Sequence, residues 1–277
     1  MIMIELLKAA IIGIVEGITE WLPVSSTGHM ILVKEFIQFN GVSEEFWNMF
    51  LVVIQLAAIL AVVIIFFEKL NPFYGHKSSR QKKQTFQLWI KVIIGCLPAA
   101  IIGIPLNDWF DKLENSMVVS ATLIIYGILF IVLEYFNRGR EFEVRDTARM
   151  TYKTAFLIGC FQCLALVPGT SRSGATILGA MLLGVSRAAA AEFSFFLSAP
   201  VMFGASLIKV LKFILSGAVM TSLEIQVLIM GCIVSFVVSL VSIKFLMGYV
   251  RKHSFALFGY YRIILGILVI AYFMFLK

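Results

Sequence analysis

Residues 16–30, EGITEWLPVSSTGHM, place two glutamates, a cluster of hydroxyl side chains and a histidine between apolar segments. Residues 167–176, VPGTSRSGAT, form a second interruption of this kind, with an arginine between two serines. Ionisable groups at membrane depth cost free energy and are retained where they have a function. The two stretches therefore predict broken helices whose polar centres carry the chemistry of the protein.

The rest of the chain has the composition of an integral membrane protein. Of its 277 residues, 60% are apolar and 14% are charged, whereas a soluble domain has about 45–50% apolar and about 25% charged residues. Continuous apolar runs, each long enough for a membrane-spanning helix, lie near 47–67, 88–106, 116–136, 189–209, 226–247 and 256–276. Their continuity does not favour a β-barrel, whose strands alternate. We expect an all-α polytopic membrane protein.

The net charge of +7 reflects basic loops between the apolar runs. These loops lie at 68–84, 137–153 and 251–253, and the positive-inside rule places them in the cytoplasm. In that topology Lys209 and Lys212 lie on the outer side, against the rule. The loops are too short to form a nucleic-acid-binding domain, so we expect no nucleic-acid partner and, at most, contact with anionic membrane lipid.

An internal repeat is indicated at an offset of 146 residues. Gly13 matches Gly159, Glu16 matches Gln162, Ser25 matches Ser171 and Gly28 matches Gly174. Each unit reads as a re-entrant helical hairpin followed by three transmembrane helices, over about 1–137 and 154–277, joined by a basic linker at 138–153. Because three spans are an odd number, the second unit is predicted to be inverted relative to the first, with the two hairpins meeting near the midplane. The whole chain is one membrane domain.

The two glutamates of the first hairpin predict a bound cation. Glu16 and Glu20 are four residues apart and share one face of a helix. Two adjacent carboxylates at this depth require a divalent cation, a shared proton or a cationic neighbour, and oxygen ligation suits Mg²⁺ or Ca²⁺. The alternative is that both glutamates are solvated at the membrane interface, which their apolar flanks argue against.

The segment PVSSTGH, residues 23–29, supplies hydroxyls around Gly28 at the start of a returning helix. Hydroxyls and exposed N–H groups at a helix start favour an oxyanion, and glycine lets the backbone approach it. His29 can act as an acid, a base or a nucleophile near neutral pH.

Arg172 of the second hairpin has two interpretations. Its planar guanidinium suits a phosphate, and serines and glycines surround it. It is either a phosphate clamp or the structural counter-ion of Glu16 and Glu20. The clamp is favoured, since a counter-ion would not require those neighbours. Two hairpins that together bind phosphate favour a phosphatase over a secondary transporter, although inverted repeats are typical of transporters too.

The motifs EGITE, PVSSTGH and PGTSRSGAT together resemble those of the undecaprenyl-diphosphatase family, also called bacitracin-resistance proteins, and the similarity extends over essentially the whole chain. The resemblance implies an enzyme that removes the terminal phosphate of undecaprenyl diphosphate, recycles the lipid carrier of peptidoglycan synthesis and confers bacitracin resistance. It also implies a divalent cation, a homodimer and a location in the bacterial inner membrane. The alternative function is an inverted-repeat transporter or a lipid-phosphate flippase.

The site residues follow from the motifs that match the family. Glu20, Ser26, His29 and Arg172 are the expected catalytic residues, and Glu16 and Glu20 the expected metal ligands. His29 attacks directly, or it deprotonates Ser26 or water; the sequence does not choose among these. The residues expected to bind phosphate are Ser25, Thr27, Gly28, Gly169, Thr170, Ser171, Ser173, Gly174 and Thr176. We expect the site to open to the outer face, because the first hairpin enters from there.

Overall fold

The structure, a computed structural model, describes residues 2–75 and 77–275, and this part of the chain is helical apart from its loops and one isolated bridge between Val144 and Val185. Within it, six helices are long and apolar enough to cross a membrane. They are α3 (Glu44–Ile65), α5 (Ser79–Asp111), α6 (Ser116–Phe136), α9 (Arg187–Leu215), α10 (Ser222–Tyr249) and α11 (Ala256–Phe275). The predicted all-α polytopic fold is confirmed.

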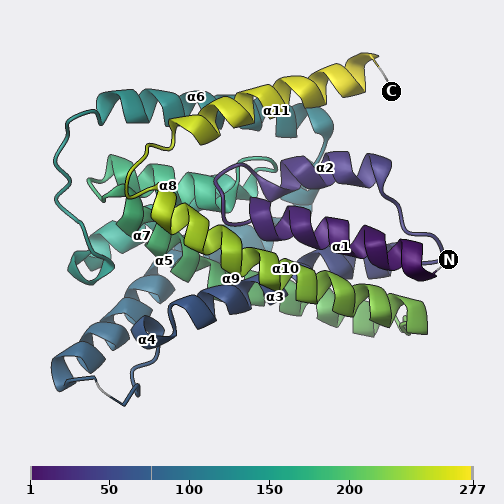
Figure 1. The fold of residues 1–277 in the computed structure, drawn as a ribbon, viewed down its shortest axis with the longest axis horizontal. Coiled ribbons are helices and arrows are strands. Elements are labelled where there is room, and N and C mark those ends of the chain that lie inside the picture. Colours follow the sequence, from purple (N-terminus) through teal and green to yellow (C-terminus); the bar gives the residue numbers. More distant parts are fainter. Residues whose placement is uncertain (1, 76, 276–277) are drawn as a thin grey trace.

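The chain also has two broken helical hairpins, one before α3 and one before α9. The first comprises α1 (Ile2–Thr19) and α2 (Ser26–Phe36), and the second comprises α7 (Tyr152–Gln162), the 3₁₀ turn η2 (Cys163–Leu166) and α8 (Arg172–Leu182). Each is followed by three long helices: α3, α5 and α6 after the first, and α9, α10 and α11 after the second (Figure 1). The inversion of one unit relative to the other and the unit boundaries remain predictions.

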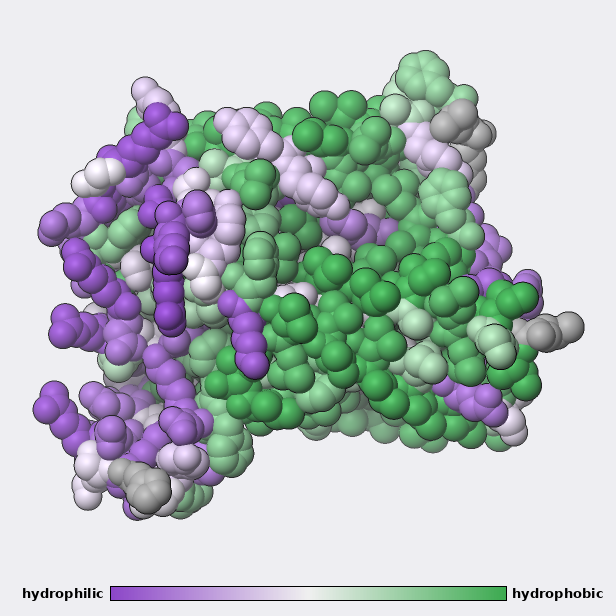
Figure 2. Space-filling model, in the orientation of Figure 1, coloured by the Kyte–Doolittle hydropathy of each residue, from purple (hydrophilic) through white to green (hydrophobic). Residues whose placement is uncertain are grey.

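Apolar and polar residues separate along the longest axis of the molecule. Figure 2 shows a broad hydrophobic zone across the middle and hydrophilic residues gathered at the end where α4 (Phe67–Leu70) and the α6–α7 linker lie. The basic loops at 68–84 and 137–153 are at this end, as the positive-inside prediction requires. A bilayer around the hydrophobic zone would leave this end in water.

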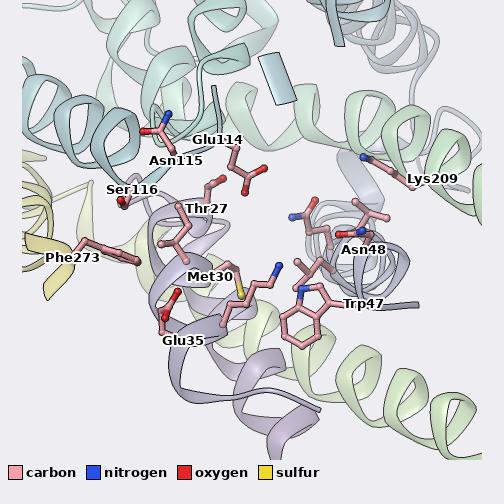
Figure 3. Close-up of a pocket in the computed structure, with 15 residues that line it drawn as sticks. Thr27, Met30, Glu35, Trp47, Asn48, Glu114, Asn115, Ser116, Lys209 and Phe273 are labelled. Atoms are coloured by element: carbon pink, nitrogen blue, oxygen red, sulfur yellow. The ribbon is translucent and has the colours of Figure 1, made fainter. Parts of the chain in front are cut away.

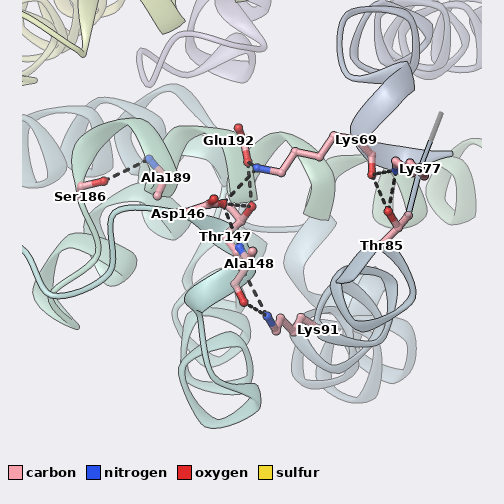
Figure 4. Close-up of polar contacts among 10 residues, drawn as sticks. All are labelled: Lys69, Lys77, Thr85, Lys91, Asp146, Thr147, Ala148, Ser186, Ala189 and Glu192. Carbon is pink, nitrogen blue, oxygen red and sulfur yellow. Dashed lines mark hydrogen bonds and ion pairs between the residues drawn. The ribbon is translucent and has the colours of Figure 1, made fainter. Parts of the chain in front are cut away.

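A polar network anchors the linker at this end (Figure 4). Lys69 Nζ donates to Asp146 Oδ1 at 3.2 Å and to Glu192 Oε1 at 2.5 Å, while Lys91 Nζ donates to the carbonyl oxygens of Thr147 and Ala148 at 3.2 and 2.9 Å. Partial burial acts to raise the pKa of Asp146, but the Ala148 N–H and the Lys69 ammonium outweigh it and hold that pKa below its usual value. The linker is therefore fixed by charged contacts at neutral pH.

Close packing of α6 against α11 brings the last helix over the two hairpin loops. Gly127 and Gly259 face each other, because a Cβ on either would lie 2.7 Å from the carbonyl oxygen of the other. Small residues at such crossings let helix backbones approach closely in membranes. Two and three residues beyond Gly259, the side chains of Tyr261 and Arg262 reach the loops described below.

Candidate active site

The two hairpin loops share an unusual local geometry. Ser25 caps α2 and Ser171 caps α8, with each side-chain Oγ accepting a hydrogen bond from the backbone N–H of Gly28 (3.2 Å) or Gly174 (3.1 Å). The two serines have φ of 74° and 71°, and among the described residues other than glycine only they have positive φ. Such backbone strain costs about 1–3 kcal/mol and concentrates at functional sites.

Glu20 is the point where the two loops meet. Its Oε2 accepts a hydrogen bond from Ser26 Oγ at 3.0 Å, and its Oε1 accepts one from Arg172 Nη2 at 3.0 Å. Ser173 Oγ donates to the carbonyl oxygen of Glu20 at 3.4 Å. Three of the four residues expected to be catalytic are thus linked through one carboxylate, across 152 residues of sequence.

Arg172 contacts both hairpins and the helix behind them. Its Nη1 donates to the carbonyl oxygen of Ser194 at 2.7 Å, and its Nη2 pairs with Glu20. The Nε atom is buried with no hydrogen-bond partner in the described part of the chain. The ion pair is the contact that a counter-ion requires, and Nε is a donor that a phosphate oxygen would satisfy, so the arrangement accommodates both interpretations.

His29 lies apart from the Glu20 network. Its Nδ1 bonds to the carbonyl oxygen of Ser25 at 2.7 Å, and its Nε2 to the hydroxyl of Tyr261 at 2.7 Å, with the two rings stacked. A carbonyl only accepts, so Nδ1 carries a proton and Nε2 of the neutral ring accepts the tyrosine proton. Within the described residues no hydrogen bond joins His29 to Ser26, Glu20 or Arg172. In this arrangement the histidine orients the first loop.

The remaining residues expected to bind phosphate are used mainly to build the loops. Thr176 Oγ1 contacts Ser194 Oγ at 2.7 Å, which fastens α8 to α9, and Ser171 Oγ lies 3.1 Å from Ser173 Oγ. Gly169 has φ of 85°, and a Cβ there would lie 2.2 Å from Thr122 Oγ1. Buried within the same loops are Ser25, Gly28, Thr170, Ser173, Gly174 and Thr176, whereas Thr27 is half-buried. Contact of any of these residues with phosphate remains a prediction.

Glu16 is the one predicted metal ligand with a free oxygen inside the protein. The residue is 1% exposed, and its Oε1 has no hydrogen-bond partner in the described part of the chain. Among the described residues no group of three or more His, Cys, Asp or Glu is placed to hold a metal ion. Glu16 and Glu20 therefore fit a hard cation only as a pair of oxygen ligands, with further oxygens coming from hydroxyls, water or a phosphate.

Arg262 was not among the residues predicted from the sequence, yet it joins the two loops. It is fully buried, and its Nη2 donates to the carbonyl oxygens of Gly169 (3.0 Å) and Thr170 (2.9 Å), while Nη1 donates to that of Pro23 (3.3 Å). An arginine inside the apolar run 256–276 was a usable signal, because a charge in a spanning helix normally has a partner or a function.

Comparison with known proteins gives a consistent result over the whole chain. The sequence profile of the family described as Bacitracin resistance protein BacA matches residues 9–268. An undecaprenyl-diphosphatase of Streptococcus mutans is 56% identical over 273 residues, covering 98% of this chain and 97% of that protein. Proteins of the same name from Desulfitobacterium hafniense (99% and 98% covered) and Lactiplantibacillus plantarum (98% and 98% covered) are each 55% identical, over 275 and 272 residues.

Proposed function

Because the chain belongs to the bacitracin resistance protein family and is an undecaprenyl-diphosphate phosphatase of the membrane, we propose that hydrolysis takes place where Glu20 joins the two hairpin loops. The observation that carries this proposal is the Ser26–Glu20–Arg172 network. It puts a hydroxyl and a guanidinium each within hydrogen-bond distance of one carboxylate, that of Glu20. These are the groups that phosphoryl transfer requires.

Ser26 is the proposed nucleophile. Its Oγ would form a bond to the terminal phosphorus as the bond from that phosphorus to the bridging oxygen breaks, releasing undecaprenyl phosphate. The serine proton passes to Glu20, which already accepts the Ser26 hydrogen bond. Glu20 gives this proton to the departing phosphate oxygen and is again a carboxylate. A water molecule then attacks the phosphoserine and passes a proton to Glu20, which returns a proton to Ser26 Oγ as the bond from that oxygen to phosphorus breaks. This step regenerates Ser26 and releases inorganic phosphate. Overall, one undecaprenyl diphosphate and one water give one undecaprenyl phosphate and one inorganic phosphate.

The backbone around this network favours an anion. Ser26 and Arg172 are the first residues of α2 and α8, and the unpaired N–H groups at a helix N-terminus stabilise negative charge. The free Nε of Arg172 adds a charged donor. Preorganised donors would thus stabilise the charge that develops on the phosphate oxygens in the transition state. Such electrostatic stabilisation is the largest contribution to the rate enhancement of many enzymes.

Glu16 and Glu20 are the residues that would hold a divalent cation, Mg²⁺ or Ca²⁺. Bound there, the ion would neutralise phosphate charge. The buried, unpartnered Oε1 of Glu16 supports the assignment.

The proposal also includes the location of the protein. It lies in the bacterial inner membrane, with its basic loops in the cytoplasm and its site open to the outer face, and it forms a homodimer.

The function is tested by measuring phosphate release from undecaprenyl diphosphate by purified protein in detergent. We expect release of one phosphate per lipid, loss of activity on adding EDTA, and recovery with excess Mg²⁺ or Ca²⁺. Glu16→Gln should raise the metal concentration required for half-maximal rate by about tenfold or more, since losing even an outer-shell partner of a metal ligand costs about 10–100-fold in metal affinity. An exposed control, Glu45→Gln, should not alter it. Full activity in EDTA would remove the cation from the proposal, and no release with any metal would contradict the assigned site.

A further inference from the structure

A large polar cavity lies beside the first loop, outside the Glu20 network. It has a volume of about 580 Å³, and Thr27, the neighbour of Ser26, forms part of its wall. Figure 3 shows the side chains of Thr27, Asn48, Glu114 and Lys209 arranged around this space, with the Lys209 ammonium directed into it. The walls come from α2, α3, the α5–α6 connection, α9 and α11.

The wall formed by α3 carries two amide side chains in an otherwise apolar spanning helix. Asn48 and Gln55 both line the cavity, together with Leu51 and Val52. Positions 48, 51, 52 and 55 recur at the spacing of one helix face. An amide side chain in a spanning helix costs free energy when it faces lipid, whereas water in a cavity can satisfy its hydrogen bonds. The two amides on this face of α3 therefore indicate that water fills this cavity.

Hydrolysis of a membrane lipid needs such a space for its soluble reactants. Each turnover consumes one water and releases one phosphate dianion, and neither the charge nor its hydration shell is stable in hydrocarbon. The C55 chain, by contrast, is more stable in lipid than beside the amides and charged side chains that this lining contains. We propose that this cavity is the aqueous route by which inorganic phosphate leaves the site and water enters it. This inference rests on the function proposed above.

The charges around the cavity suit passage of an anion. The lining includes two lysines and two glutamates: Lys34, Lys209, Glu35 and Glu114. Positive side chains in the wall favour passage of a dianion that leaves the Ser26 loop, and an equal number of carboxylates limits its retention. This role also accounts for the predicted position of Lys209 on the outer side, against the positive-inside rule. Lys212, three residues further along α9, does not line the cavity.

The route is tested by closing it reversibly. A cysteine is introduced by Asn48→Cys, and the protein is treated with sulfonatoethyl methanethiosulfonate, which adds a bulky anion inside the cavity. We expect hydrolysis to fall at least about tenfold relative to the same variant before treatment, because product release then limits turnover. Reduction with dithiothreitol should restore the rate. Gln55→Cys provides a second position should the first variant not fold.

Two controls and two substrates make the result specific. Lys212→Cys, at the same end of α9 but outside the cavity, and wild-type protein, whose four cysteines do not line it, should keep their rates after treatment. A short, water-soluble prenyl diphosphate should be slowed as much as undecaprenyl diphosphate. An unchanged rate in the treated variants would overturn the proposal, and so would slowing of the C55 substrate alone, which would make the cavity a lipid entrance. Absence of hydrolysis by untreated wild type would instead contradict the proposed function.

Discussion

Glu20→Gln is expected to lower kcat by about three orders of magnitude, since general base catalysis contributes typically 10²–10⁴-fold. Glutamine keeps the size of the side chain, and its carbonyl oxygen can still accept one hydrogen bond, but it cannot take the proton of Ser26. The variant also loses the ion pair with Arg172, which is 3.0 Å long in the structure. The measurement is steady-state phosphate release in detergent, with KM and kcat separated.

The controls for this variant distinguish chemistry from folding. Glu45→Gln changes an exposed carboxylate at the start of α3 and should retain the wild-type rate. Thermal unfolding of the Glu20 variant should remain cooperative, so that the rate loss is read on folded protein. Retention of kcat within a factor of two in folded Glu20→Gln would remove this carboxylate from the proposed mechanism.

Arg262→Met is expected to abolish most activity through the backbone rather than through contact with substrate. The arginine donates to carbonyl oxygens of both hairpin loops, at Pro23, Gly169 and Thr170. Without it these buried acceptors lose their partners, at a cost on the order of 3 kcal/mol in total. The two loops would then be free to separate, and we expect a lower unfolding temperature together with a fall in kcat of about 10²-fold or more.

A conservative variant of Arg262 and a variant of a distant arginine show whether Arg262 acts by positioning the two loops. Arg262→Lys supplies charge from a single ammonium, which cannot reach all three carbonyls as a planar guanidinium does, so it should rescue only part of the rate. Arg251→Met, at an exposed arginine in the loop before α11, should behave as wild type. Wild-type kcat in a stable Arg262→Met protein would show that the loops keep their geometry without it.

The sequence alone predicts most of the fold because its strongest signals are local. Six continuous apolar runs correspond to the six long helices, although α5 begins at Ser79 rather than near 88. Its first turns are polar, and a capping box between Ser78 and Gln81 starts the helix in a segment that hydropathy assigns to a loop. The two polar interruptions likewise predict the broken hairpins, since glycine, proline and serine mark helix breaks within a few residues.

The site is only partly predictable, because its contacts join segments that are far apart in the chain. Glu20, Ser26 and Arg172 were identified from their residue types and motifs, and the structure places them in one network. The bond between His29 and Tyr261 spans 232 residues, and the bonds of Arg262 to the loops span 92 to 239 residues. No local pattern encodes such pairings; they follow from the crossing of α6 and α11.

The most direct test of the account is to look for a phosphate group on Ser26 during turnover. Undecaprenyl diphosphate labelled with ³²P in its terminal phosphate is mixed with excess protein, the reaction is quenched within one turnover, and protein-bound label is located by peptide mapping. We expect transient, acid-stable label on Ser26 in wild type, and neither label nor phosphate release in Ser26→Ala. Hydrolysis at the wild-type rate by Ser26→Ala, or label carried by His29, would contradict it.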